Sequence, residues 1–368
     1  MNKNDRTVMV AMSGGVDSSV AAALLRDQGY RVVGATMLLW DGEAAGVESG
    51  CCGTQDLVDA RAVCARLGIN HYGIDLREEF RREVVEPFAM TYLRGRTPNP
   101  CILCNERLKF HYLLRKAREV GARWLATGHY ARIEGRGPFR LCRGTDRSKD
   151  QSYFLFPVDQ EILAHLIFPL GNLTKDEVRD KAGELRLAVH EKPESQEVCF
   201  IPPDGLKDFL REASHDEIVP GPLLDTAGNV IGSHDGFCFY TIGQRKGLGV
   251  AAAKPLYVTR IDAAGNTIVL GTREEASFPD MLVESATWVA GQPPSDHFRA
   301  QVQVRHRHRP AEGEVRILEG GSFRVFFDEP QHGVAPGQAA VVYDGDTVLG
   351  GGWISGSEPN VQKPIKRD

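Results

Sequence analysis

The first part of the chain alternates short apolar runs with longer amphipathic segments. Val8-Met9-Val10 is apolar, and the stretch from Val16 to Leu25 is nearly continuous in small and aliphatic residues before Gly29 ends it. Short apolar runs are typical of buried strands, and longer apolar stretches that end at a glycine are typical of helices. This segment therefore predicts a strand, a glycine-containing turn and a helix.

The same alternation continues to about residue 135. We expect further strands at 31–39, 69–76 and 124–127, and helices at 56–67, 77–94 and 105–120. Regular alternation of this kind predicts a doubly wound parallel sheet, in which ligands bind at the carboxyl ends of the strands. The turn at 11–19, the segment 97–104 and Gly128-His129 all fall at such ends.

The pattern becomes irregular after residue 140 and changes character after about residue 215. Residues 149–155 are expected to run from a polar turn into an apolar strand, and 194–201 to form a short strand. A capping box at Thr174 to Glu177 predicts the start of a helix. Beyond residue 215, short apolar runs between Gly and Pro residues predict β structure.

We therefore expect an α/β protein. Its predicted parts are a doubly wound domain at 1–213, a small β-rich domain at 214–278, a β-barrel at 279–358 and a disordered tail at 359–368.

Composition narrows the class of protein. The chain has 368 residues, 42% of them hydrophobic and 25% charged, as expected for a globular protein of two or three domains. Its net charge of −5 places any nucleic-acid surface in a local patch. No apolar run approaches the ~20 residues of a membrane span, so we expect no membrane partner. Eight cysteines without a recognisable secretory signal favour reduced thiols and a cytoplasmic location.

The turn from Ala11 to Ser19 carries the first candidate chemistry. Gly14 and Gly15 allow backbone to approach a bound anion, and the N-terminus of the following helix attracts negative charge. Asp17 holds the place of the lysine of a Walker A loop, which suits a cation bridging phosphates. An ordinary capped turn uses the same residue types, so only the whole string favours a phosphate site.

Two cysteines, Cys101 and Cys104, stand between a proline-containing loop and a predicted helix. A helix N-terminus stabilises a thiolate, which favours a reactive cysteine. Burial as small hydrophobic residues and half of a zinc site are the alternatives. Cys51 and Cys52 could be redox-active or metal-binding, but loop packing is the better explanation, and we assign them no role.

The segment from Gln301 to Arg309 is the most basic stretch of the chain. As a strand it would present Arg305, Arg307 and Arg309 on one face and His306 and His308 on the other. Such a face is either exposed to solvent or in contact with phosphates. Phosphate contacts position a nucleic acid without reading its sequence.

Taken together, several segments resemble one family. The string Ser13-Gly14-Gly15-Val16-Asp17-Ser18 resembles the PP-loop of the ATP pyrophosphatases. Five further segments, in the same order along the chain, resemble the tRNA-specific 2-thiouridylases of that superfamily: Thr97–Asn105, Gly128–Arg132, Lys149–Leu155, Val198–Ile201 and Tyr240–Gly249.

The resemblance implies ATP-dependent replacement of the 2-oxo group of the wobble uridine, position 34 of the tRNA, by sulfur. It implies that ATP, with Mg²⁺, binds Ala11, Met12, Ser13, Gly14, Gly15, Val16, Asp17, Ser18, Met37 and Gly128. It places the target base beside Asn99, Pro100 and Cys101. It implies tRNA contacts at His129, Lys149, Asp150, Gln151, Arg305, His306 and Gln338.

The resemblance also implies roles for the thiols. Cys104 matches the catalytic nucleophile, and Cys199 matches the cysteine that carries the incoming sulfur as a persulfide. A Cys104–Cys199 disulfide would remain after transfer, and one segment would have to move to bring the two thiols together. Many family members have Asp at the position of Cys101. Three thiols at 101, 104 and 199 therefore leave open a [4Fe–4S] cluster as the sulfur carrier.

Partners and competing functions follow from the same comparison. The family implies tRNAs of the Glu, Gln and Lys type, a sulfur-relay protein or cysteine desulfurase as sulfur donor, and a monomer. Another PP-loop synthetase would keep the glycine turn but would not need Cys104 and Cys199. A tRNA-binding protein without catalytic activity would bind tRNA without releasing AMP.

Overall fold

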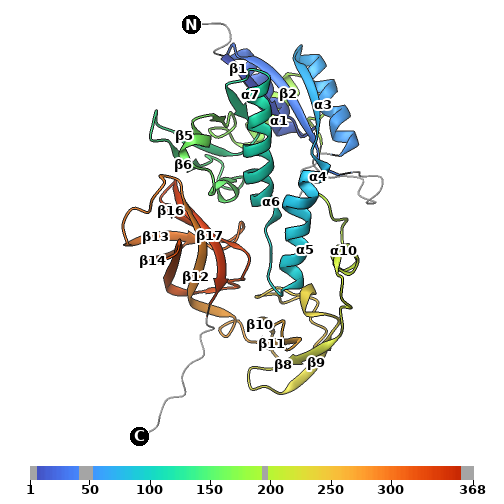
Figure 1. The fold of residues 1–368 in the computed structure, drawn as a ribbon, viewed down its shortest axis with the longest axis vertical. Helices are drawn as coiled ribbons and strands as arrows, with labels where there is room; N and C mark the ends of the chain where they lie inside the picture. The colour runs from blue at the N-terminus through green and yellow to red at the C-terminus, as the bar shows by residue number, and fades with distance from the viewer. Residues whose placement is uncertain (1–5, 41–52, 193–197, 358–368) are drawn as a thin grey trace.

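The computed structural model describes residues 6–40, 53–192 and 198–357, and it confirms the expected α/β class. Cys51, Cys52 and the tail at 359–368 lie outside the described residues. Figure 1 shows a parallel sheet with helices at one end of the molecule and two β-rich units at the other. No described helix is long and apolar enough to cross a membrane.

The N-terminal sheet has the strand order β3-β2-β1-β4-β7, and the pairs within it are parallel. Val8, Val10 and Leu125 are fully buried in it, as the apolar runs predicted. Its strands are β1 (Thr7–Ala11), β2 (Arg31–Leu38), β3 (Asn70–Asp75), β4 (Trp124–Ala126) and β7 (Leu166–Ile167).

Helices cover both faces of this sheet. The helical segments are α1 (Val16–Asp27), α3 (Thr54–Leu67), α4 (Arg77–Phe80), η2 (Arg81–Val85), α5 (Glu86–Leu93), α6 (Pro100–Leu103), η3 (Cys104–Leu113), α7 (Leu114–Glu119), η4 (Ser152–Leu155), α8 (Gln160–Leu163), α9 (Lys175–Glu184) and α10 (Leu206–Ala213). The capping box expected at α9 is confirmed: Thr174 Oγ1 accepts from the Glu177 N–H, and the Glu177 carboxylate accepts from the Thr174 N–H.

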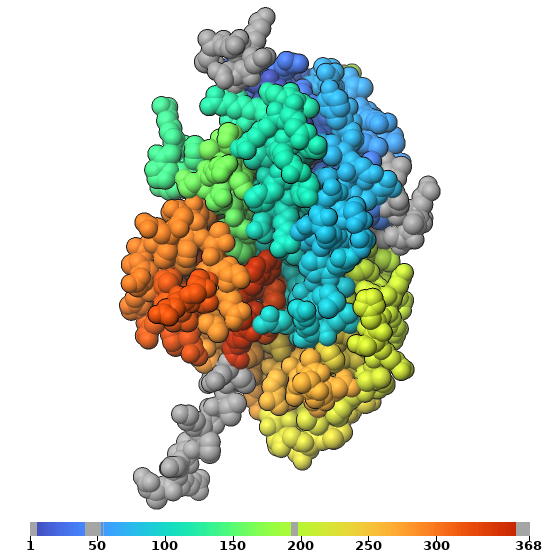
Figure 2. Space-filling model, in the orientation of Figure 1, coloured from blue at the N-terminus to red at the C-terminus, as the bar shows by residue number. Residues whose placement is uncertain are grey.

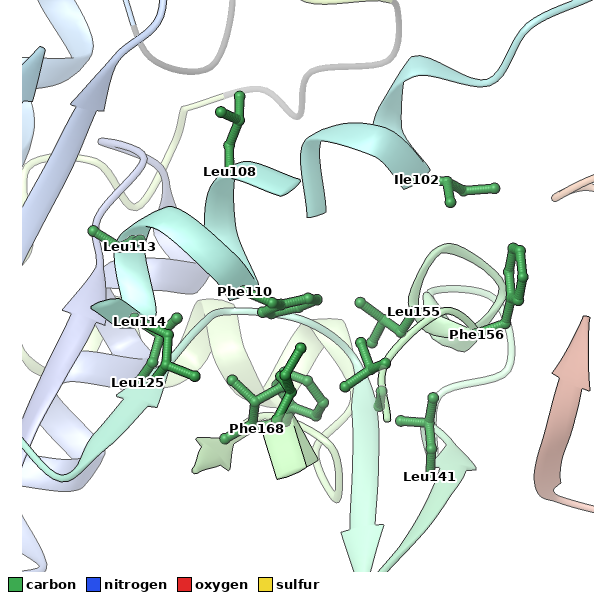
Figure 3. Close-up of a cluster of buried hydrophobic side chains, with 14 of the residues drawn as sticks. Ile102, Leu108, Phe110, Leu113, Leu114, Leu125, Leu141, Leu155, Phe156 and Phe168 are labelled. Atoms are coloured by element: carbon green, nitrogen blue, oxygen red, sulfur yellow. The ribbon is translucent and has the colours of Figure 1, made fainter. Parts of the chain in front are cut away.

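The predicted helix at 105–120 begins earlier than expected, at Pro100. Proline at the first helical position is favourable because its missing N–H would have no partner there. The helix continues through the wider π-helical segment η3, which buries Leu108, Phe110 and Leu113. Figure 3 shows Phe110 between Leu125 on one side and Leu155 on the other, and Leu108 and Leu113 belong to the same hydrophobic cluster. This packing fixes the helix that carries Cys101 and Cys104.

The strands expected within 149–155 and 194–201 are not formed in the described part of these segments. Residues 152–155 form the 3₁₀ segment η4, and residues 198–201, the described part of the other, form a turn. At η4 the Asp150 carboxylate accepts from the Ser152 N–H and from the Gly144 N–H, which bends the chain away from an extended path.

The middle unit contains a four-stranded sheet of order β10-β11-β8-β9 and one 3₁₀ segment. Its elements are β8 (Gly221–Leu224), β9 (Val230–His234), η5 (Phe237–Phe239), β10 (Tyr257–Asp262) and β11 (Thr267–Gly271).

The C-terminal unit is a barrel in which β12, β15, β14, β13, β16 and β17 follow one another and β12 pairs back to β17. Its strands are β12 (Ser277–Trp288), β13 (His297–Gln303), β14 (Ala311–Leu318), β15 (Ser322–His332), β16 (Ala339–Asp344) and β17 (Thr347–Gly356). The final β-barrel predicted from the sequence is therefore confirmed.

A hairpin of the N-terminal part joins this barrel. Strands β5 (Ala131–Glu134) and β6 (Arg140–Arg143) pair with each other, and β6 pairs with β17 through Cys142 and Thr347. Arg132 and Arg147 both form ion pairs with Asp346 of the barrel. The barrel is thus packed against the N-terminal part, as Figure 2 shows on one face of the molecule.

Candidate active site

The turn after β1 has the features of an anion site. Gly14 has φ +68°, which favours glycine, and Gly15 is the N-cap residue of α1. The Ser18 hydroxyl accepts from the Ser13 N–H at 3.2 Å, and the Ser19 hydroxyl donates to the Gly15 carbonyl at 2.7 Å. These bonds fix the turn, while the first backbone N–H groups of α1 have no carbonyl acceptor within the helix.

Gly128 packs directly against this turn. A Cβ on Gly128 would lie 2.8 Å from the Ser18 nitrogen and 2.9 Å from the Asp17 carbonyl carbon. Only glycine allows β4 to end this close to the start of α1, so the two expected nucleotide-binding segments adjoin one another.

One large cavity connects the residues predicted from the sequence. It has a volume of about 1610 Å³, and the following predicted residues line it: Ala11, Met12, Ser13, Asp17, Ser18, Met37, Asn99, Pro100, Cys101, Cys104, Gly128, His129, Lys149, Asp150, Gln151, Cys199 and His306. Gly14, Gly15 and Val16 belong to the same turn as Ser13. Segments almost 300 residues apart therefore face a single space.

Three thiols line this cavity. Cys101 is exposed in the first turn of α6, and Cys104, at the start of η3, is half-buried. Cys199 is half-buried in a turn whose next residue, Phe200, packs edge-on against Phe80 and Phe88 with ring centroids 5.4 and 5.2 Å apart. Aromatic packing thus anchors the segment that presents Cys199.

Cys101, Cys104 and Cys199, the three thiols of the iron–sulfur alternative, all line this cavity. Across residues 6–40, 53–192 and 198–357, no group of three or more His, Cys, Asp or Glu side chains is arranged to hold a metal ion. The three thiols are therefore not a single-ion site here, and the iron–sulfur alternative stays a prediction.

Asp17 has protein partners that the sequence did not reveal. Lys175 Nζ donates to both Asp17 oxygens, at 2.7 and 2.9 Å, and the Tyr130 hydroxyl donates to Oδ1 at 2.8 Å. The ammonium of Lys175 already neutralises the carboxylate. Asp17 therefore does not fit the role of a magnesium ligand in this arrangement. Lys175 is 158 residues away in sequence, and its only local signal is its place in the capped start of α9.

His129 lies at the boundary between the nucleotide turn and the helix of Cys104. Its Nδ1 is 2.7 Å from the Thr127 hydroxyl, and its ring packs edge-on against Phe168. Burial, together with the positive charge of Lys109, lowers the pKa of His129 well below its usual value. The ring is therefore neutral at physiological pH. Lys109 also lines the cavity and donates to Asn105 Oδ1 at 2.8 Å.

Asp150 and Gln151 organise the rim near β5. The Asp150 carboxylate pairs with Arg143 at 2.9 Å, and Gln151 Oε1 accepts from the Tyr130 N–H at 3.0 Å. The Arg143 guanidinium also lies 3.6 Å from the centre of the Tyr343 ring in the barrel. These contacts hold the rim to both the N-terminal part and the barrel, and Lys149 stands beside them on the cavity.

The basic segment of the barrel departs from the predicted strand. Strand β13 ends at Gln303, because the Gln303 side chain donates to the carbonyls of Arg305 and His306 and closes a turn there. The alternation of exposure nevertheless remains: Arg305, Arg307 and Arg309 are exposed, whereas His306 is half-buried. The His306 ring packs on Phe154 with centroids 4.3 Å apart.

Gln338 contacts the backbone of the loop that precedes Asn99. Its Nε2 donates to the carbonyls of Thr97 and Pro98 at 3.1 and 2.9 Å. The barrel therefore holds the loop immediately before Asn99 and Cys101 in place.

Comparisons with known proteins cover nearly the whole chain. The family models "tRNA methyl transferase HUP domain", "tRNA methyl transferase PRC-barrel domain" and "Aminomethyltransferase beta-barrel domain" match residues 6–203, 207–272 and 279–354. A tRNA-specific 2-thiouridylase MnmA of Geobacter metallireducens is 48% identical over 359 residues, which cover 96% of this chain and 97% of the relative. One of Acetivibrio thermocellus is 46% identical over 355 residues, covering 95% and 99%.

Proposed function

Because the chain belongs to the tRNA-specific 2-thiouridylase family, we propose that it replaces the 2-oxo group of the wobble uridine of tRNA by sulfur with ATP as activator. It is a tRNA sulfurtransferase by family. The observation that carries the proposal is the single cavity shared by the glycine turn, Cys104 and Cys199. Two thiols facing a nucleotide site suit sulfur transfer.

The first chemical step is activation of the carbonyl. The uridine O2 attacks the α-phosphorus of ATP, the bond to pyrophosphate breaks, and AMP becomes attached to O2. Negative charge then leaves on the pyrophosphate. Backbone N–H groups at the start of α1 are suited to stabilise it, because fixed donors need no reorganisation during the reaction.

The second step is sulfur transfer. The terminal sulfur of a persulfide on Cys199 attacks C2 and the C2–O bond to AMP breaks. The thiolate of Cys104 then attacks the Cys199 sulfur, and the S–S bond breaks so that one sulfur stays on C2. A Cys104–Cys199 disulfide remains, which a two-electron thiol reductant returns to two thiols. The target base must leave its stack to reach the cavity.

The rim offers the tRNA a polar and basic surface. Lys149, Gln151 and His306 line the cavity, and the exposed Arg305 extends the same side of the barrel. Phosphate contacts of this kind position the anticodon region without reading its bases. We propose tRNAs of the Glu, Gln and Lys type as substrates and a persulfide-carrying protein as the sulfur donor.

The test is sulfur transfer to unmodified tRNA by wild type, Cys104→Ser and Cys199→Ser, with Cys142→Ser as a matched control buried in β6. We expect 2-thiouridine, AMP and pyrophosphate from wild type and the control. Cys199→Ser is expected to form no 2-thiouridine from a persulfide donor, and Cys104→Ser no more than a trace. Full activity in either variant contradicts the proposed thiol chemistry.

A further inference from the structure

Lys192, which lies just beyond α9, bonds to the nucleotide turn from outside the cavity. Its Nζ donates to the Gly14 carbonyl oxygen at 3.2 Å, to Asp56 Oδ1 at 2.8 Å and to Asp59 Oδ2 at 2.6 Å. The two carboxylates belong to the first turns of α3. One ammonium therefore links the chain after α9, the start of α3 and the glycine turn.

Gly14 also packs closely against the start of α3. Its φ is +68°, and a Cβ there would lie 2.5 Å from the Asp56 carbonyl oxygen. Asp56 is buried, and its carboxylate also accepts from the Gly53 N–H at 3.1 Å, so the start of α3 is a fixed support. The Gly14 peptide therefore contacts both the start of α3 and Lys192.

The orientation of one peptide group follows from these contacts. In a planar trans peptide the C=O and the N–H point in opposite directions. When the Gly14 carbonyl points to Lys192, the N–H of Gly15 points away from it. Gly15 is the N-cap of α1, where backbone N–H groups have no acceptor within the helix.

We propose that Lys192 is a positioning residue for ATP, which holds the Gly14–Gly15 peptide so that the Gly15 N–H donates to the pyrophosphate part of the nucleotide. The inference rests on the proposed use of ATP at this turn. It assigns to the lysine a role in binding the nucleotide and none in binding tRNA.

The positive charge of Lys192 also favours binding of the nucleotide at this turn. Asp56 and Asp59 would place two negative charges beside a turn that binds an anion, and the ammonium compensates part of that charge. Partial burial disfavours the ammonium, but the hydrogen bonds to Asp56 and Asp59 outweigh this and raise the pKa of Lys192. The side chain therefore stays charged at physiological pH.

The test compares Lys192→Met with Asp59→Asn, which weakens the same cluster but leaves the bond to Gly14. Lys116→Met, on a surface ion pair with Glu119, is the control for loss of a lysine. Equilibrium dialysis gives the Kd of ATP, filter binding gives the Kd of unmodified tRNA, and thiolation at saturating tRNA gives the KM for ATP.

We expect Lys192→Met to raise the Kd and the KM of ATP about tenfold or more, equivalent to about 1.4 kcal/mol. The Kd of tRNA should stay within about twofold, and Asp59→Asn and Lys116→Met should bind ATP within about threefold of wild type. A rise in the Kd of ATP without a rise in the Kd of tRNA distinguishes positioning of the nucleotide from general damage to the fold.

Three results overturn the inference: unchanged ATP binding in Lys192→Met, a parallel rise in the Kd of tRNA, or an equal effect of Asp59→Asn. If Lys192→Met does not fold, Lys192→Leu, which also lacks a hydrogen-bond donor, takes its place, and an unchanged Kd of ATP in it overturns the inference as well. If wild type thiolates tRNA and Lys192→Met binds ATP as tightly as wild type, this inference is wrong but the proposed function stands. Wild type that binds no ATP removes the proposed function with it.

Discussion

Replacing Gly14 by alanine tests how tightly the nucleotide turn is packed, and Gly68 offers a matched control. Both glycines have φ in the left-handed region, at +68° and +69°. A Cβ at Gly68 would meet nothing within 4 Å, whereas at Gly14 it would meet the Asp56 carbonyl oxygen at 2.5 Å. The two substitutions share the backbone strain and differ in the clash.

The expected losses follow from these two terms. An alanine forced into the left-handed region costs about 1–2 kcal/mol, which is the whole expected loss for Gly68→Ala. Overpacking adds about 1–3 kcal/mol at Gly14, so Gly14→Ala should lose about 2–5 kcal/mol in total. The Asp56 carbonyl is part of the backbone of α3 and has little room to move. We therefore expect the loss of stability in Gly14→Ala to lie in the upper part of this range.

Hydrogen exchange read by mass spectrometry measures the loss where it occurs. Peptides from β1, α1 and α3 should exchange faster in Gly14→Ala, and peptides from the barrel should not change. The Kd of ATP should rise in Gly14→Ala and stay near the wild-type value in Gly68→Ala. Equal losses of stability in the two variants would refute the reasoning from the close contact.

Three further predictions concern charge. Lys175→Met leaves Asp17 with the Tyr130 hydroxyl; because Asp17 is one-third exposed, we expect a loss of about 1–3 kcal/mol in urea unfolding, and Asp17→Asn in the same chain should recover part of it. The folded-state pKa of His129 lies below its unfolded value, so stability should fall as pH drops below about 6.5, and urea midpoints for His129→Gln should show a shallower fall. Arg305→Ala should weaken tRNA binding and reduce the slope of log K against log salt by about 1 in filter binding; an unchanged slope removes Arg305 from the phosphate contacts.

The sequence was sufficient for elements whose signal is local. The apolar run at Val8 to Val10, the glycine turn and the capping box at Thr174 each predicted an element that the structure contains. The start of the helix at Pro100 was missed, because the proline was interpreted as part of a loop although it also suits the first helical position.

Other features depend on specific side-chain hydrogen bonds, which the pattern of apolar and polar residues does not show. The apolar residues after Ser152 have the composition of a strand, but Asp150 captures two backbone N–H groups and turns the chain. Gln303 ends β13 in a similar way, by donating to two carbonyls ahead of it. Lys175 and Lys192 are ordinary surface-type residues in sequence, and their partners Asp17 and Gly14 lie far away along the chain.

The hairpin of β5 and β6 limits how this architecture can be divided or exchanged. Its strands are encoded before residue 150, yet β6 pairs with the last strand of the barrel. A fragment cut ahead of β12 would keep β6 with an unpaired edge, which invites association with other chains. A barrel transplanted from a relative would likewise have to match the edge of β6, where Cys142 pairs with Thr347.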